Sequence, residues 1–78
     1  MQGHRIPRAR IVAAIPIERV DLTLGDGESR PRIGGVVELD HGFTTSAGEP
    51  AGIVLCLNAD RSVRWVADVL ESEMEVLP

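Results

Sequence analysis

Few residues of this 78-residue chain have the types and spacing that metal binding requires. Metal sites need His, Cys or carboxylate ligands at close spacing, and His4, His41 and Cys56 are widely separated. Asp40 directly precedes His41, but such a pair is more typical of a solvated turn than of half a metal site. The sequence therefore predicts no metal site and no cofactor.

Three carboxylates close to the C-terminus could be imagined as an acid/base set, namely Glu71, Glu73 and Glu75. In a strand they would line one exposed face, so we interpret them as a solvated acidic edge. The serines and threonines lack the glycine context that places a nucleophile on a sharp turn. These residues favour a non-catalytic protein.

Charge argues against nucleic acid as the main partner. The net charge is −4, and the chain has one Trp, one Phe and no Tyr, whereas nucleic-acid binding draws on phosphate neutralisation and aromatic stacking. An N-terminal arm with Arg5, Arg8 and Arg10 beside His4 is the part that could contribute. An accessory module on nucleic acid is therefore an alternative function. The acidic C-terminal end could instead pair with this basic end, either within one chain or between two chains.

Trp65 and Phe43 are the side chains best able to anchor a protein partner, because aromatic residues are enriched at binding hot spots. Alternatively, Trp65 fills the core. In that case the outward face of the same strand is formed by Arg64, Val66 and Asp68. An outward Val66 that lies between two charged residues would suit a contact between subunits. All five are candidate partner-binding residues.

The stretch that would position these side chains runs from Gly52 to Leu70. Two β-branched-rich runs flank the polar connector 58–61, which is the composition of a β-hairpin with a four-residue turn. Cys56 lies inside the first run, so we interpret it as a buried small hydrophobe rather than a reactive thiol.

Further strands are predicted before this hairpin. Residues 10–15 are rich in apolar, β-branched types and are bracketed by prolines. Residues 20–24 alternate between apolar and polar types before a Gly-Asp-Gly turn, and residues 36–40 alternate after a glycine pair. Residues 41–50 are predicted to form a loop of small residues. Residues 1–9 have no periodicity and are expected to form a flexible arm, which leaves 10–78 as one small domain.

Residues 62–77 fit two patterns. Apolar residues recur at helical spacing and Ser62 could cap the first turn, which predicts a C-terminal amphipathic helix and an α+β fold. However, apolar residues also alternate from 63 to 69, and a helix would leave Trp65 on its outer side. We favour a strand through Val69, one helical turn at 71–73 and a last strand at 74–77.

This order of elements resembles that of the SH3-like small barrels, with a long first loop over 16–32 and a short turn at 71–74 before the last strand. The resemblance is clearest at Gly35-Val36-Val37-Glu38 and from Val69 to Leu77. It implies an all-β barrel of five to six strands.

A trimethoprim-resistant dihydrofolate reductase of the SH3-like class builds its active site in the pore of a tetramer. Its pore motif, Val-Gln-Ile-Tyr, agrees with Val63-Arg64-Trp65-Val66 at the valine alone. An enzyme whose site is shared across subunits is therefore a second alternative function, and nicotinamide-cofactor binding would discriminate it.

The function predicted first is binding. A domain of this size has a thin core, and one cysteine cannot form an internal disulfide, so we expect a homo-oligomer. A strand edge or the face from Arg64 to Asp68 would dock another protein. No stretch is long and apolar enough to cross a bilayer, and the N-terminus lacks the apolar core of a signal peptide, so a cytoplasmic location is expected.

Overall fold

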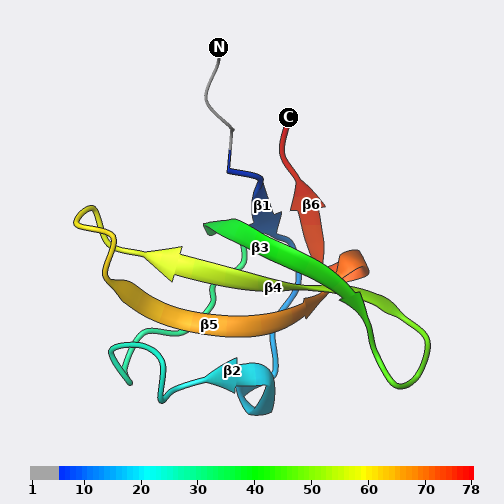
Figure 1. Cartoon of the computed structure of the whole chain (residues 1–78), viewed down its shortest axis with the longest axis horizontal. Coiled ribbons are helices and arrows are strands. Elements are labelled where there is room, and N and C mark those ends of the chain that lie inside the picture. Colours follow the sequence, from blue (N-terminus) through cyan, green and yellow to red (C-terminus); the bar gives the residue numbers. More distant parts are fainter. Residues whose placement is uncertain (1–5) are drawn as a thin grey trace.

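The computed structural model describes residues 6–78, which form an all-β domain built on a single antiparallel sheet (Figure 1). Its strands are β1 (Arg8–Ile11), β2 (Val20–Asp21), β3 (Val36–Thr44), β4 (Pro50–Leu57), β5 (Val63–Leu70) and β6 (Met74–Val76). Their order in the sheet is β2-β5-β4-β3-β1-β6. Two single-turn 3-10 helices, η1 (Ile17–Arg19) and η2 (Glu71–Glu73), each lead into a short strand. The predicted all-β class is confirmed.

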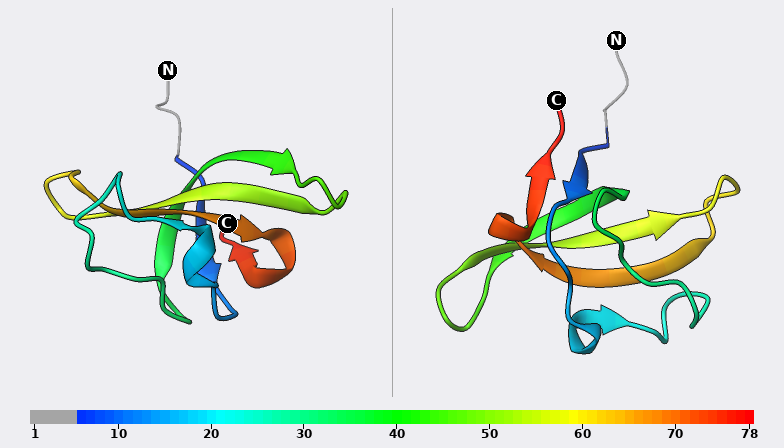
Figure 2. Two further views of the ribbon diagram at one scale, coloured as in Figure 1. Left: turned by 90° about the horizontal axis from the view of Figure 1, so that it is seen from below. Right: turned by 180° about the vertical axis from the view of Figure 1, so that it is seen from behind.

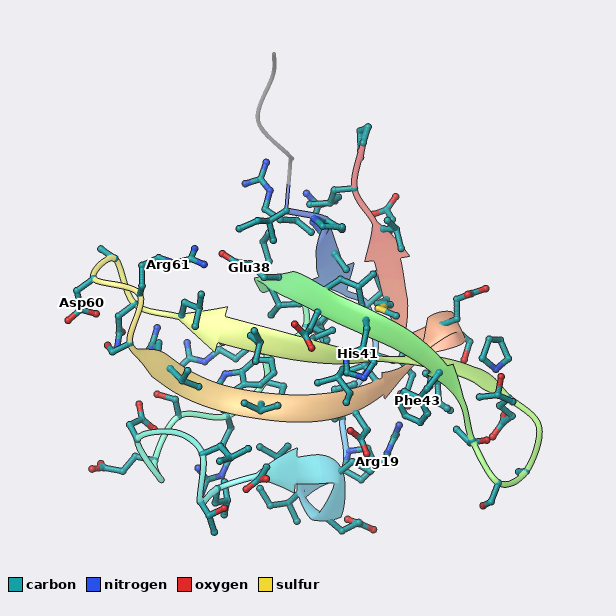
Figure 3. All side chains as sticks on the ribbon, in the orientation of Figure 1. Arg19, Glu38, His41, Phe43, Asp60 and Arg61 are labelled. Atoms are coloured by element: carbon teal, nitrogen blue, oxygen red, sulfur yellow. The ribbon has the colours of Figure 1, made fainter. Side chains whose placement is uncertain are left out.

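The predicted hairpin is the pair β4 and β5, and its turn includes Ser62. The Asn58 N–H donates to the Ser62 carbonyl (2.9 Å), and the Arg61 N–H donates to the Asn58 carbonyl (3.0 Å). Arg61 takes a left-handed backbone conformation (φ 74°). Its guanidinium pairs with both oxygens of Glu38 on β3 (2.6 and 3.3 Å), so a side chain ties the turn to the neighbouring strand (Figure 3).

The C-terminal third is extended. Trp65, Ala67 and Val69 alternate along β5 and are 3%, 1% and 0% exposed. A helix would have turned Trp65 away from this core, and burial of the indole outweighs the helical spacing. The alternative of an amphipathic helix over 62–77 is wrong, whereas the single turn at Glu71–Glu73 and the last strand are confirmed.

The first strand starts earlier than predicted, at Arg8 rather than Arg10. Ala9 is completely buried and pairs with Val37 of β3, so the end of the expected arm belongs to the sheet. Residues 1–5 lie outside the described part of the chain. The strand also ends earlier than predicted, at Ile11 rather than Ile15. Ala13 and Ile15, predicted to share a strand face with buried Ile11, are half-buried in the segment that follows β1.

The strand predicted at 20–24 ends after Asp21. The Asp21 carboxylate accepts hydrogen bonds from the Thr23 N–H (2.9 Å) and hydroxyl (2.7 Å). Such local side-chain bonds compete with a strand ladder and bend the chain. Leu22 and Leu24 are consequently exposed rather than packed on a core face.

Strand β3 is longer than predicted and runs through His41 to Thr44. Its register against β4 shifts between Leu39 and His41, which is the mark of a β-bulge at Asp40. The expected loop from 41 to 50 is therefore reduced to the tight turn after Thr44.

Trp65 is the one large aromatic side chain of the core. Figure 2 shows β3, β4 and β5 as a curved layer with β1 and β6 beneath it. The cluster between these strands also contains Ala9, Ile11, Val20, Val37, Val54, Ala67 and Val69. Such a small core makes any single packing defect costly.

An ion pair joins the two edges of the sheet. Arg19 directly precedes edge strand β2, and Glu73 directly precedes edge strand β6. Their side chains form two hydrogen bonds of 2.7 and 2.6 Å, and the Glu73 carboxylate also accepts from the Leu70 N–H (2.8 Å). The sheet thus closes through side chains at this point.

Acid should weaken this closure. The hydrogen bond from Arg19 lowers the pKa of Glu73 below its ordinary value of 4.5. A carboxyl with a lowered folded pKa stabilises the fold fully above its unfolded pKa, and that contribution is lost as pH falls through the folded value. Glu73→Gln should reduce the free energy of unfolding by about 1–3 kcal/mol at neutral pH.

Urea unfolding across a pH series measures this effect. The difference between wild type and Glu73→Gln should shrink as the pH drops below 4.5. Glu71→Gln, at an exposed position of the same turn, is the matched control and should leave the profile unchanged. Parallel profiles for wild type and Glu73→Gln would show that the pair does not stabilise the fold.

Candidate functional site

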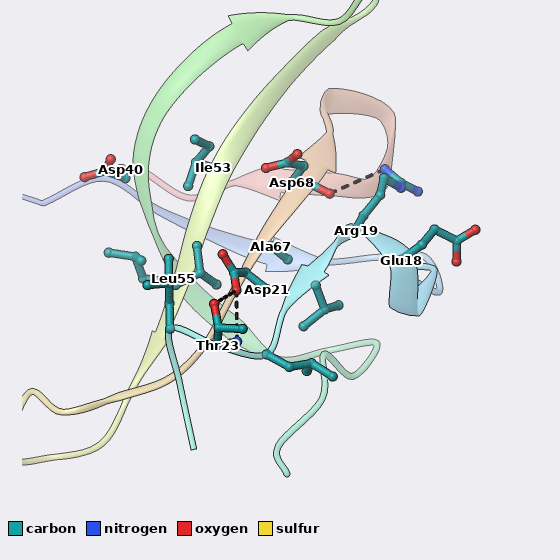
Figure 4. Close-up of a pocket in the computed structure, with 13 residues that line it drawn as sticks. Glu18, Arg19, Asp21, Thr23, Asp40, Ile53, Leu55, Ala67 and Asp68 are labelled. Carbon is teal, nitrogen blue, oxygen red and sulfur yellow. Dashed lines mark hydrogen bonds between the residues drawn. The ribbon is translucent and has the colours of Figure 1, made fainter. Parts of the chain in front are cut away.

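An open groove of about 750 Å³ lies over the outer face of β4 and β5 (Figure 4). Its floor is formed by the half-buried side chains of Ile53, Leu55 and Val66, which alternate with the core residues of the same strands. Leu22 and Leu24, which are 37% and 60% exposed, form the wall beside β2. The groove therefore presents continuous apolar surface to solvent.

The wall is held against β5 by its backbone. The Asp26 N–H donates to the Arg64 carbonyl (3.1 Å), and the Asp21 carboxylate holds the bend at Thr23. Gly25 lies so close to the Arg64 carbonyl that a Cβ at this position would overlap it. These contacts place the segment that carries the two leucines next to β5.

Carboxylates surround the apolar floor. Those among the lining residues are Glu18, Asp21, Asp40 and Asp68. The hydrogen bond from the Thr23 hydroxyl lowers the pKa of Asp21, so this carboxylate stays ionised. Arg19 is the one cation among the lining residues, and Glu73 already pairs with it. The rim is therefore acidic and favours a basic partner.

The groove brings together part of the predicted partner-binding set. Val66 lies on its floor and Asp68 on its rim, both facing outward as the strand pattern predicts. Trp65 is inside the core, so it cannot anchor a partner at the surface or line a pore between subunits. Arg64 is exposed but lines a different pocket.

Phe43 does not join this group. It is half-buried on β3, opposite Ala51 of β4, and is not among the residues that line the groove (Figure 3). His41, two residues before it, lies in the strand rather than in a turn, and its Nδ1 is 2.7 Å from Asp40 Oδ2. That pair is exposed, as predicted.

The basic residues predicted for nucleic acid are dispersed or paired. Arg10 lies 3.1 Å from Glu75 on β6, so one basic residue of the N-terminal end pairs with one acidic residue of the C-terminal end within the chain. Arg8 is exposed on β1, and Arg5 lies outside the described residues.

Sequence reasoning missed two features of the site. Glu73 was expected on a solvated edge, but its side chain is 14% exposed and pairs with Arg19. No spacing in the sequence links residues 54 positions apart. The groove wall was missed because Leu22 and Leu24 fit a strand pattern, although the Asp-Leu-Thr step at 21–23 is a turn signal that the alternation concealed.

In the described part of the chain, no group of three His, Cys, Asp or Glu residues is arranged to hold a metal ion. Residues 6–78 include no helix with the length and apolar character needed to cross a membrane. Comparison with protein-family models, curated proteins and solved structures finds no match. Function is therefore inferred from the geometry of the chain itself.

Gly25→Ala tests how the groove wall is held. The new Cβ would overlap the Arg64 carbonyl, so the segment must move off β5, at a cost of about 1–3 kcal/mol in the free energy of unfolding. Hydrogen exchange at the Asp26 amide should also accelerate. Gly42→Ala is the control, because its Cβ would meet nothing closer than the Ala51 carbonyl at 3.5 Å. If both substitutions changed the free energy of unfolding and the exchange rate of the Asp26 amide equally, the close packing of Gly25 would be contradicted.

Proposed function

We propose that this protein is a non-catalytic binding protein whose groove docks an apolar segment of a protein partner that carries Arg or Lys residues. The observation that supports this most is the combination of an apolar floor and a rim of four carboxylates. Apolar contact supplies affinity, and the single sign of the rim selects basic partners and speeds their approach.

The same rim disfavours the alternative of nucleic-acid binding at this face, because carboxylates repel phosphates. The alternative of an enzyme with a shared site gains little support, since Trp65 of the stretch that resembles the pore motif is inside the core and Val66 is the one residue of that stretch that lines the groove. Its discriminating test is still nicotinamide-cofactor binding. A cytoplasmic location remains a prediction.

Self-association is the second part of the proposal. Large apolar side chains are exposed outside the groove, namely Ile6, Val12, Ile17, Ile33, Val36 and Val76. A small domain gains stability by covering such surface with a second copy. Light scattering over a concentration series should show a mass above 8.4 kDa that rises with concentration. A constant monomer mass would refute this part.

Peptide binding by calorimetry tests the docking role. The probe is a peptide with a central Val-Leu run flanked by Arg, and its counterpart has Glu in place of Arg. The Arg peptide should bind at least about tenfold more tightly, since like charges across an interface are unfavourable. Added salt should weaken it, because exposed charges are screened.

Variants locate the binding surface. Leu24→Ser removes apolar area from the groove and Asp68→Asn removes one rim charge, so each should weaken binding of the Arg peptide several-fold. Ile33→Ser is the matched control, because Ile33 is 67% exposed but does not line the groove. Equal affinity for the Arg and Glu peptides would refute the proposed docking surface. So would an equal loss of affinity for the Arg peptide in Leu24→Ser and Ile33→Ser.

A further inference from the structure

A second pocket, of about 590 Å³, is lined by three arginines of this acidic chain. Arg30 and Arg32 come from the loop before β3, and Arg64 comes from β5. All three are exposed. This pocket lies apart from the acid-rimmed groove, with which it shares no lining residue.

Within residues 6–78, the guanidinium groups at this pocket have no carboxylate within salt-bridge distance. The arginine–carboxylate ion pairs of residues 6–78 use Arg10, Arg19 and Arg61. Arg30 donates to backbone carbonyls only, those of Gly27 (3.3 Å) and Ser29 (3.0 Å). Three cations that the fold leaves without a salt bridge therefore share one concavity.

The loop that carries Arg30 is fixed by Asp26. Its carboxylate accepts hydrogen bonds from the Glu28 N–H (2.8 Å), the Ser29 N–H (2.7 Å) and the Ser29 hydroxyl (2.7 Å). These bonds lower the pKa of Asp26 to about 2. The charge of Arg64 contributes to this lowering, so the Asp26 carboxylate lies near the pocket although it does not line it, and Glu28 is the acidic residue among the lining residues.

The inner side of the pocket is apolar. Val37 and Trp65 reach it from the core, and Cys56 and Val36 complete it. Burial raises the pKa of the Cys56 thiol, which stays protonated and uncharged at neutral pH. An inorganic ion would leave this surface uncovered, whereas a ligand with an organic body would cover it.

We propose that this pocket binds a small organic anion, whose carboxylate or phosphate head contacts Arg30, Arg32 and Arg64 and whose apolar body rests on Cys56 and Trp65, which are paired across β4 and β5. Planar guanidinium groups match both head groups with paired hydrogen bonds. This binding is independent of the docking groove, because the two pockets are lined by different residues.

The single tryptophan makes the pocket directly observable. Trp65 lines it, so its indole N–H resonance reports occupancy in NMR titrations of the full chain. The probes are benzoate, phenyl phosphate, benzyl alcohol and inorganic phosphate. Benzoate or phenyl phosphate should shift this resonance and the amides of 28–32 and 64 saturably, and the tighter of the two identifies the preferred head group.

Two comparison probes, benzyl alcohol and inorganic phosphate, and a set of arginine variants test the proposal. Benzyl alcohol and inorganic phosphate should each bind at least about tenfold more weakly than the better anion, and Arg32→Ala and Arg64→Ala should weaken that anion to a similar extent. Arg64→Lys, which keeps the charge, should recover part of the loss. Arg8→Ala, at an exposed arginine outside the pocket, should change nothing.

Several results would overturn the proposal. A Trp65 resonance that no anion shifts would exclude the site, and equal binding of benzyl alcohol would remove the role of charge. Equal binding of inorganic phosphate would remove the role of the organic body. An equal loss of anion affinity in Arg8→Ala and Arg64→Ala would mean that binding depends on the overall charge of the chain and not on this pocket.

Discussion

The ion pair between Arg19 and Glu73 is the interaction on which the closure of this small sheet depends. The sheet ends in two short strands, β2 and β6, and each edge strand follows a single helical turn that carries one member of the pair. Backbone ladders do not join these edges, so two side-chain hydrogen bonds do. A partly buried pair is costly to break, because the remaining charge would be left without its partner.

Closure at this point also shapes the surface. Arg19 fixes the start of the segment that bends away at Asp21 and then returns to β5 at Asp26. That path exposes two leucines beside the outer face of β4 and β5, creating an apolar groove with an acidic rim. A pocket of opposite character is lined by Arg30 and Arg32, which follow the bend, and by Arg64 of β5; none of the three has a carboxylate partner among residues 6–78. A chain of net charge −4 thus separates its charges between two sites.

The sequence predicts the parts of this fold that depend on local pattern. Apolar and polar residues alternate around Trp65, and a polar connector follows Leu57. These two local patterns are enough to predict the hairpin, the extended C-terminal third and the outward positions of Val66 and Asp68. Features that depend on distant partners could not be predicted. Ala9 is buried by strands from elsewhere in the chain, Glu73 is desolvated by Arg19, and Leu22 is exposed because Asp21 ends its strand.

The most direct test of the docking account is an amide-resolved NMR titration of the labelled protein with the Arg-flanked Val-Leu peptide. If the peptide docks in the groove, we expect saturable shifts confined to residues 18–24, 53–55 and 66–68, with little change at the pocket lined by Arg30, Arg32 and Arg64. Shifts spread over the whole surface, or confined to an edge strand such as β6, would contradict the assignment of the groove as the binding surface.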